Sequence, residues 1–317
     1  MNAIQRVGIA GAGAWGMALA EAAKRAGRDV FLWSRRGAAA GHDGTFPVTG
    51  DDKAVAQADA LLLVVPAQEL AGVAERLTPH LRRTTPLVIC AKGLARPGNT
   101  LLSDVLEKAL PGHPVAVLSG PTFAAEVARG QPTAVTVASS DENLAHALIN
   151  ALGSTSFRPY ASSDPVGVQL AGAVKNVIAI ACGIVAGRTL GENTRAALMT
   201  RGLAEMTRLG RALGASPETF AGLAGLGDLS LTATSPTSRN FRFGLMLGKG
   251  DTINAARGKI SGVVEGAKTA AAVVELAARH QVDVPISAAI AAIVEQGADI
   301  DATIAGLLMR PFKAETA

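Results

Sequence analysis

The first half of the chain alternates between short apolar runs and longer stretches in which apolar residues recur every three or four positions. The runs predict buried strands, and the longer stretches predict helices. Strands are expected over residues 6–10, 29–33, 60–65, 86–91, 114–118, 133–138 and 156–160. Helices are expected over residues 17–27, 68–77 and 99–109, and behind a cap at Ser139 or Ser140. This alternation predicts a Rossmann-type, doubly wound parallel sheet, with a loop over residues 37–50.

The second half of the chain has helical periodicity throughout. Helices are expected over residues 166–184, 193–213, 263–280, 285–297 and 300–309, with a further one that begins at the cap Ser216 and Pro217. An all-α C-terminal domain is therefore expected, and 317 residues are enough for two cores. We place the boundary after Asp164, with a dinucleotide-binding domain over residues 1–164 and a helical substrate-binding domain over residues 165–317.

One lysine lies where a lysine is costly. Residues 166–184 are apolar on nearly every side, yet Lys175 and Asn176 occupy the middle of this stretch. A buried, unpaired ammonium costs several kcal/mol, so such a group is usually paired or has a lowered pKa. Lys175 is therefore a candidate for proton transfer. The alternative is a lysine that extends to water or pairs with a carboxylate for structure only.

A glycine-rich turn joins the first predicted strand to the first predicted helix. Gly11 suits a tight turn, Gly13 allows a pyrophosphate to approach the backbone, and Gly16 allows close packing of the helix on the strand. The free N–H groups at the helix N-terminus, around Ala14 and Trp15, favour an anion. The pattern indicates a dinucleotide site, although glycines also mark ordinary turns.

The residues after the second predicted strand bear on the choice of cofactor. NAD-preferring sites usually have an acid there, but this chain has Ser34, Arg35 and Arg36. Two guanidinium groups suit a 2′-phosphate, so we expect NADP(H) to be preferred over NAD(H). The alternative is a pair of surface arginines.

Further polar residues lie at predicted strand ends and in a loop between helices. Lys92 directly follows an apolar strand, where ligands of such sheets bind, although it could be an ordinary surface lysine. The loop offers a carboxylate at Asp228 and donors that suit a phosphate: Thr232, Ser238, Arg239 and Asn240. A capped helix start with a surface arginine is the alternative.

Composition narrows the class of protein. Apolar residues make up 49% of the chain, as in globular proteins, and aromatic residues only 3%. The low aromatic content argues against a single-strand nucleic-acid binder. Thirty basic and 26 acidic residues give a net charge of +4 with no long basic run, so no nucleic-acid partner is expected.

The remaining sequence signals concern location and metals. Cys90 and Cys182 lie in apolar stretches, and the N-terminus lacks a signal-peptide pattern, so we expect buried thiols in a reduced cytoplasmic setting. The apolar stretch around Lys175 is interrupted by polar and small residues, and no membrane span is expected. The five histidines are isolated from one another, so no metal site is expected.

Together, the motifs resemble the bacterial-type NAD(P)-dependent glycerol-3-phosphate dehydrogenases. The resemblance extends from residue 7 to about residue 290, in the family's order. It is carried by GAGAWG at 11–16, Lys92-Gly93, SGPTFAAE at 119–126, GVQLAGAVKNVIAI at 167–180, TRGLAEMTRLG at 200–210, GLAGLGDLSLT at 222–232, SRNFRFG at 238–244 and VVEG at 263–266. The resemblance implies interconversion of sn-glycerol 3-phosphate and dihydroxyacetone phosphate, supply of glycerol 3-phosphate for phospholipid synthesis, and a homodimer.

The resemblance also implies roles for residues. Lys175 would be the proton donor and acceptor, Lys92 would contact substrate and cofactor, and Asp228 would join both lysines in one network. The expected substrate contacts are Lys92, Gly120, Thr122, Lys175, Asn176, Asp228, Thr232, Ser238, Arg239 and Asn240. The expected cofactor contacts are Gly11, Gly13, Ala14, Trp15, Gly16, Arg35, Arg36, Lys92, Ala124, Arg239, Val263 and Glu265.

The chain departs from the family pattern in one segment. Between Arg36 and Ala60 it is shorter than usual and lacks the family's Asn-rich stretch that contains Leu-Pro. The resemblance therefore does not settle the adenine side of the site or the cofactor preference. Two rival functions also remain: a related dehydrogenase acting on another hydroxy acid, and a non-catalytic module that senses NADP(H) and binds a protein partner.

Overall fold

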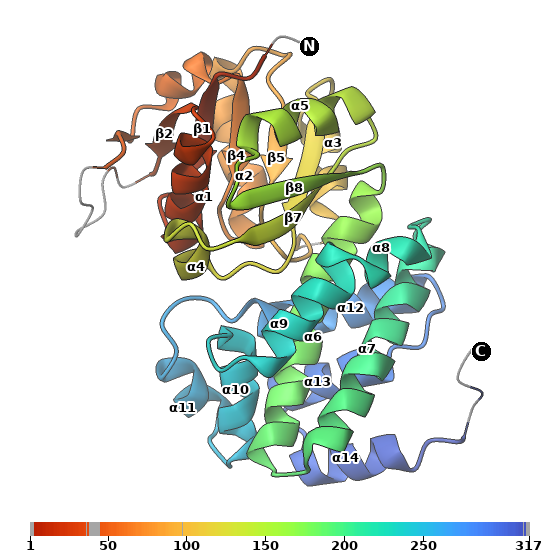
Figure 1. Cartoon of the computed structure of the whole chain (residues 1–317). Helices are drawn as coiled ribbons and strands as arrows, with labels where there is room; N and C mark the ends of the chain where they lie inside the picture. The colour runs from red at the N-terminus through yellow and green to blue at the C-terminus, as the bar shows by residue number, and fades with distance from the viewer. Residues whose placement is uncertain (1–2, 36, 38–44, 97, 313, 315–317) are drawn as a thin grey trace.

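The computed structural model describes residues 3–35, 37, 45–96, 98–312 and 314, and contains an α/β unit followed by a helical unit (Figure 1). Arg36 and residues 38–44 of the predicted loop lie outside the described residues. The change from sheet to helices falls between the last strand, which ends at Ser162, and the long helix that begins at Pro165. The Rossmann-type fold with a helical C-terminal part, predicted from the sequence, is confirmed.

The α/β unit contains one eight-stranded sheet with the order β3-β2-β1-β4-β5-β6-β7-β8. The strands are β1 Arg6–Ala10, β2 Asp29–Trp33, β3 Val48–Thr49, β4 Ala60–Leu63, β5 Leu87–Ile89, β6 Val115–Ser119, β7 Thr133–Ala138 and β8 Phe157–Ser162. Every predicted strand is present, and β3 lies inside the segment predicted as a loop. β3 pairs with β2 through only two residues, too few to leave a pattern in the sequence.

The expectation of a wholly parallel sheet is wrong at one position, because β6 and β7 are antiparallel. Residues 120–132, with the short helix α4 Ala124–Ala128, return to the same edge of the sheet from which β6 leaves. An antiparallel pair needs no crossover to the opposite edge. The connection therefore keeps Gly120 and Thr122 at the carboxyl end of β6, which is the edge where ligands bind in such sheets.

Helices cover both faces of the sheet. One apolar cluster joins it to α1 Ala14–Arg25 and α5 Glu142–Leu152, and another joins it to α2 Leu70–Leu77 and α3 Leu102–Ala109. Three 3₁₀ segments complete the unit: η1 Asp52–Gln57, η2 Ala67–Glu69 and η3 Thr78–His80.

The predicted cap of α5 at Ser139 or Ser140 is wrong. The side chain of Asp141 accepts the hydrogen bond from Asn143 N, at 2.9 Å. The Ser139 N–H is still bonded to the neighbouring strand, through Ser162 O, so this residue belongs to the strand end and not to the helix start.

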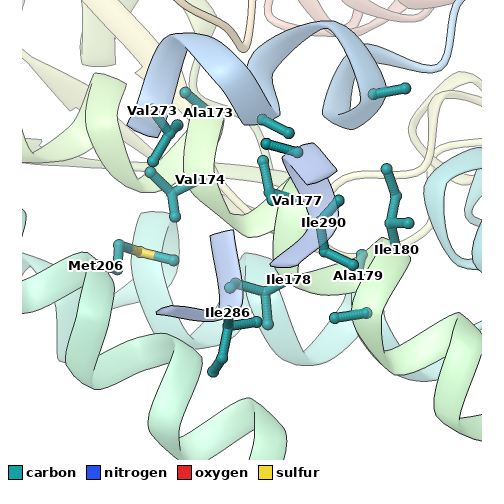
Figure 2. Packing of buried hydrophobic residues seen from close by; sticks show 14 of the residues in the cluster. Ala173, Val174, Val177, Ile178, Ala179, Ile180, Met206, Val273, Ile286 and Ile290 are labelled. Carbon is teal, nitrogen blue, oxygen red and sulfur yellow. The ribbon is translucent and has the colours of Figure 1, made fainter. Parts of the chain in front are cut away.

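The helical unit surrounds α6 Pro165–Gly187, which lies in its middle (Figure 1). Apolar side chains of α6 pack against those of neighbouring helices (Figure 2), such as Val177 of α6 and Ile290 of α13. The surrounding elements are α7 Glu192–Ala212, α8 Pro217–Ala221, the π-helix η4 Leu223–Gly227, α9 Asp228–Thr234, α10 Arg239–Gly248, α11 Ile253–Gly258, α12 Glu265–Arg279, α13 Pro285–Gln296 and α14 Ile300–Leu308. The predicted helices are all present.

Helix α6 is long and apolar enough to cross a membrane by length and composition, but 89% of its most apolar 18-residue window is buried inside the protein. This is the environment that the sequence predicts for residues 166–184. Ser216 is the N-cap residue of α8 as predicted, although its hydroxyl binds the carboxylate of Glu218 and not the helix backbone.

Helices α6 and α10 cross at van der Waals contact between their backbones. A Cβ atom added at Gly183 would lie 2.1 Å from Phe241 O, and one added at Gly244 would lie 2.0 Å from Ile180 O. Such distances are far below ordinary contact, so neither position accepts a side chain unless the helices separate. The crossing therefore fixes the start of α10 relative to the middle of α6.

Candidate active site

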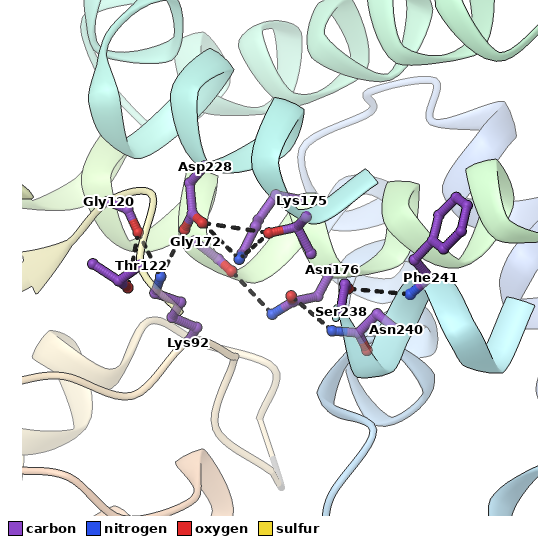
Figure 3. A network of polar contacts seen from close by, with 11 residues as sticks. Lys92, Gly120, Thr122, Gly172, Lys175, Asn176, Asp228, Ser238, Asn240 and Phe241 are labelled. Carbon is purple, nitrogen blue, oxygen red and sulfur yellow. Dashed lines mark hydrogen bonds and ion pairs between the residues drawn. The ribbon is translucent and has the colours of Figure 1, made fainter. Parts of the chain in front are cut away.

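The predicted buried lysine is buried and paired. Lys175 projects from the middle of α6, and its Nζ donates to Asp228 Oδ1 at 2.8 Å and to Thr232 Oγ1 at 2.6 Å (Figure 3). The Lys175 side chain is 7% exposed and that of Asp228 is 1% exposed. The alternative of a lysine extending to water is therefore excluded by the structure.

A second lysine reaches the same carboxylate from the α/β unit. Lys92 follows β5, and its Nζ donates to Asp228 Oδ2 at 2.7 Å and to Gly120 O at 2.9 Å (Figure 3). Thr122 lies beside it and donates to the same carbonyl at 3.2 Å. One carboxylate thus binds two ammonium groups, one from each unit of the chain.

The chain places Asp228 by means of an unusual helical turn. The π-helix Leu223–Gly227 immediately precedes α9, and Asp228 is the first residue of α9. A Cβ atom added at Gly225 would lie 2.1 Å from Phe220 O, so the wide turn packs closely on the segment before it. Single π turns occur frequently at functional sites. Here the π turn places the carboxylate of Asp228 between the amines of Lys92 and Lys175.

Two asparagines connect the lysine helix to the start of α10. Asn240 Nδ2 donates to Asn176 Oδ1 at 2.8 Å, and Asn176 Nδ2 donates to Gly172 O at 3.2 Å. Asn240 Oδ1 also accepts from Gly266 N at 3.0 Å, in the first turn of α12. Both amides are buried, and these bonds orient the neighbouring side chains.

The start of α10 combines the two interpretations that the sequence left open. Ser238 is the N-cap, and its hydroxyl accepts from Phe241 N at 3.2 Å. Arg239 is exposed and lies beside the loop at Gly262, where an added Cβ atom would come within 2.6 Å of Nη1. The segment is therefore a capped helix start that also presents a cation close to the lysine cluster.

Burial sets the protonation of the central amine. The pKa of Lys175 is lowered to about 8, first by desolvation, while the charge of Asp228 opposes this change. The like charges of Lys92 and Arg239 add smaller decreases. The main cause of the decrease is therefore the loss of water around the amine.

A second carboxyl lies near the cluster. Burial raises the pKa of Glu265, and the charges of Lys268 and Arg239 oppose the increase. Glu265 begins α12, directly after the loop that contains Val263, and its Oε2 lies 3.8 Å from a Cβ atom added at Gly93. The first turn of α12 therefore faces the segment that carries Lys92.

The glycine turn has the predicted geometry. Gly11 has φ of +125°, and an added Cβ atom would lie 2.2 Å from Val64 O. An added Cβ atom at Gly16 would lie 1.8 Å from Gly11 O, so the helix packs on the turn. Gly13 has no atom within 4 Å of an added Cβ, which leaves open space at the N-terminus of α1. The N-cap of α1 makes no side-chain hydrogen bond, and the start of the helix has no acidic residue. The glycine-rich segment before α1 therefore fits a pyrophosphate.

The remaining predicted cofactor residues are spread along the same edge of the sheet. Ala14 and Trp15 start α1, and Ala124 starts α4. Arg35 follows β2 and forms an ion pair with Glu69, with Nη1 and Oε2 3.1 Å apart.

Two polar groups near the site were given no role on the basis of the sequence. Ser119 is buried at the end of β6, and its Oγ has no hydrogen-bond partner among the described residues. An added Cβ atom at Gly172 would lie 3.0 Å from this oxygen. The other group is Glu69, which meets Arg35 across the sheet edge. Ser119 belongs to the SGPTFAAE motif, but the motif does not indicate that its hydroxyl is buried. Glu69 has no local signal, because its contact with Arg35 depends on a distant segment.

Other predictions concern metals, thiols and cavities. Among the described residues, no group of three or more His, Cys, Asp or Glu side chains could hold a metal ion. Cys90 and Cys182 are buried free thiols, as predicted. A cavity of about 890 Å³ at Arg82, Pro86 and His146 contains none of the predicted site residues. It adjoins the amino ends of β5 and β6, whereas ligands of such sheets bind at the carboxyl ends.

Comparison with known proteins agrees with this architecture. The family model described as NAD-dependent glycerol-3-phosphate dehydrogenase N-terminus matches residues 46–145, and the corresponding C-terminus model matches residues 164–305. Together the two models match most of the chain.

Individual relatives match over nearly the full length. A glycerol-3-phosphate dehydrogenase [NAD(P)+] of Parvibaculum lavamentivorans is 50% identical over 99% of each chain, and one of a Bradyrhizobium strain is 51% identical over 98% of each. The crystal structure of glycerol-3-phosphate dehydrogenase from Coxiella burnetii is 38% identical, with a TM-score of 0.91 over 97% of this chain and 99% of that one. The chain therefore belongs to the NAD-dependent glycerol-3-phosphate dehydrogenase family.

Proposed function

We propose that this protein interconverts sn-glycerol 3-phosphate and dihydroxyacetone phosphate with NAD(P)H. The single observation that carries the proposal is the buried Lys175–Asp228–Lys92 cluster at the junction of a glycine-turn sheet and a helical unit. The names of the full-length relatives support the same reaction. We assign cofactor binding to residues 1–164 and substrate binding to residues 165–317.

Residues of the α/β unit would hold the cofactor. The glycine turn and the N-terminus of α1 would bind its pyrophosphate. From the helical unit, Val263 and Glu265 would border its nicotinamide end. When bound, the cofactor supplies the hydride chemistry. The contribution of the protein is to exclude water, orient the substrate and manage the proton.

The substrate would lie between Lys175 and the start of α10. The N–H groups of this helix and the guanidinium of Arg239 suit a phosphate through charge and hydrogen bonds. Asn176 and Asn240 would keep α6 and the start of α10 in fixed positions relative to each other, because their side chains bind each other. A phosphate held at one end would place the C2 oxygen near the buried amine.

Lys175 would transfer the proton to and from this oxygen. In the reducing direction, negative charge builds on the C2 oxygen, which protonated Lys175 stabilises and then protonates. In the oxidising direction, neutral Lys175 accepts the proton of the hydroxyl. A pKa of about 8 makes both forms accessible near neutral pH. Asp228 fixes the position of the amine, and Lys92 would contact the substrate from the opposite side.

Several finer features are part of the proposal. Arg35 and Arg36 favour NADP(H) over NAD(H), because a 2′-phosphate pairs with guanidinium groups. The chemistry needs no metal, since the two lysines supply positive charge at the reacting oxygen. From the family resemblance, we propose a cytoplasmic homodimer that supplies glycerol 3-phosphate for phospholipid synthesis.

The decisive experiment mixes purified protein with NADPH and dihydroxyacetone phosphate and follows the absorbance of the reduced nicotinamide. Loss of absorbance that requires this substrate, and yields glycerol 3-phosphate, supports the proposal. Turnover of an unphosphorylated 2-keto acid in its place would identify a hydroxy-acid dehydrogenase. Binding of NADPH without turnover of either substrate would indicate a sensing module.

A further inference from the structure

An ion pair crosses the sheet edge next to the glycine turn. Arg35 lies two residues after β2, and Glu69 ends the 3₁₀ segment η2 that follows β4. Arg35 Nη1 and Glu69 Oε2 are 3.1 Å apart, with side chains 58% and 45% exposed. The function proposed above assigns Arg35 to the 2′-phosphate of the cofactor but gives Glu69 no role.

The position of the pair follows from the order of the strands. Strand β1 lies between β2 and β4, and it leads directly into the glycine turn. Neighbouring strands are about 4.8 Å apart, so the two side chains meet across roughly 10 Å of sheet edge, over the carboxyl end of β1. The pair thus covers the sheet edge from the carboxyl end of β2 to that of β4. Dinucleotide folds recognise the 2′ position of the adenosine ribose at the β2 end.

The pair also supplies a group that the β2 end lacks. NAD-preferring sites place an acid after β2 to accept a hydrogen bond from the ribose 2′-hydroxyl, whereas this chain has Ser34 and Arg35 there. Glu69 brings a carboxylate to the same edge from β4. Next to Arg35, the carboxylate can accept from a hydroxyl, but it repels a phosphate and competes with it for the guanidinium.

We propose that Glu69 determines selectivity between NADH and NADPH, acting against the 2′-phosphate of NADPH and in favour of the 2′-hydroxyl of NADH. The inference rests on the proposed cofactor site and adds to it the residue that moderates the preference of Arg35 for NADPH. An exposed ion pair of this kind contributes little to stability, so a bound cofactor can rearrange it at little cost.

The test compares Glu69→Gln with the wild-type protein in binary complexes, without substrate. Dissociation constants for NADPH and NADH are measured by nicotinamide fluorescence and by calorimetry. Adenosine 2′,5′-bisphosphate and AMP serve as probes of the 2′ position alone. Glu75→Gln, an exposed acid of α2, is the matched control.

We expect Glu69→Gln to tighten NADPH binding about tenfold while NADH binding stays equal or weakens, with the same trend for the two probes. Glu75→Gln should leave the ratio of the two dissociation constants unchanged. Arg35→Ala should weaken NADPH binding and remove most of the effect of Glu69→Gln, because the two residues act on one phosphate.

Two results would overturn the inference. If Glu69→Gln changes both dissociation constants by one factor, or neither, Glu69 is a structural partner of Arg35 only, and the proposed reaction stands. If the wild-type protein binds neither cofactor, the inference and the proposed function both fail. Unchanged circular dichroism and melting of the variant show that it has folded.

Discussion

The two ends of the proposed substrate and cofactor site both contain cations paired with a carboxylate, but in opposite environments. At the lysine end, the side chains of Lys175 and Asp228 are 7% and 1% exposed, and each oxygen of the carboxylate binds an amine. At the adenosine end, the side chains of Arg35 and Glu69 are about half exposed, with Nη1 and Oε2 3.1 Å apart. The buried end is preorganised for one reaction, and the exposed end can exchange partners.

The difference has an energetic basis. Charges that are out of water interact strongly, and removing one partner leaves the other uncompensated. Charges at the surface are screened by water and salt. Losing one of them therefore changes little except the binding of the ligand that it contacts. Changes at the lysine end should therefore alter chemistry, and changes at the adenosine end should alter selectivity.

The largest effect is expected from Lys175→Ala. Because this removes the group assigned to proton transfer at the C2 oxygen, kcat for dihydroxyacetone phosphate reduction should fall about a thousandfold or more. NADPH binding, measured by fluorescence, should be retained. Lys249→Ala, an exposed lysine after α10, serves as the control. Near-wild-type turnover of Lys175→Ala would rule out the assigned role.

The next largest effect is expected from Asp228→Asn, which removes the charge that holds both amines. We expect kcat to fall about a hundredfold, because the amine loses its fixed position. The charge of Asp228 raises the pKa of Lys175, so its removal should also shift the pH profile to lower pH. Asp29→Asn, at the exposed start of β2, is the control. A reduced rate with an unshifted profile would contradict the electrostatic part of this account.

Arg239→Ala tests recognition of the phosphate at the far end of the substrate. A charged hydrogen bond contributes about 1.5–3 kcal/mol, so kcat/KM for dihydroxyacetone phosphate should fall roughly 10–100-fold. Dihydroxyacetone, which lacks the phosphate, should show little change. Arg201→Ala, an exposed arginine of α7, is the matched substitution. Equal losses on both substrates would show that Arg239 does not act through the phosphate.

The pH dependence should have opposite signs in the two directions. Reduction needs protonated Lys175, so its kcat/KM should fall by up to about tenfold per unit once pH exceeds the pKa of about 8. Oxidation needs the neutral amine, so its kcat/KM should rise by up to about tenfold per unit below the pKa of about 8 and level off above it. Parallel profiles in the two directions would argue against Lys175 as the titrating group.

The smallest effect is expected on stability at the exposed end. Glu69→Gln removes an ion pair whose two side chains are both well exposed, so the free energy of unfolding should change by less than about 1 kcal/mol. Urea denaturation measures this change directly. A larger loss would mean that the pair holds β2 and β4 together, and the contrast between the two ends would then be weaker than described.

The sequence predicted what depends on local pattern. The strands, the glycine turn and α6 each have a period or composition that needs no distant partner, and Lys175 stood out because burial follows from its neighbours. The antiparallel pairing of β6 with β7 could not be predicted, since the apolar pattern of a buried strand does not record its direction. The cap at Asp141 was missed because Ser139 continues the strand pairing.

The TRGLAEMTRLG motif shows the same limit for packing. It helped to identify the family, but its sequence does not indicate what the residues contact. A Cβ atom added at Gly202 would lie 2.6 Å from Ile178 Cγ2, so α7 packs closely on α6. The carboxylate of Glu205 accepts from the backbone of Ile286 and Ser287 at the start of α13, and burial raises its pKa to about 7. Residues of the motif thus pack α7 against α6 and α13, and none of them is among the proposed reacting groups.

The glycine contact between α6 and α10 has a consequence for the size of the substrate. Helices whose backbones are in direct contact cannot shift by changes in side-chain rotamers. The contact therefore holds the amine of Lys175 at a constant distance from the helix start at Arg239. With the phosphate at this helix start, as proposed, the fixed distance would select a three-carbon ketone phosphate by its length as well as by its charge. A substrate longer by one carbon would not fit the phosphate at the start of α10 and the reacting oxygen at the amine of Lys175 at the same time.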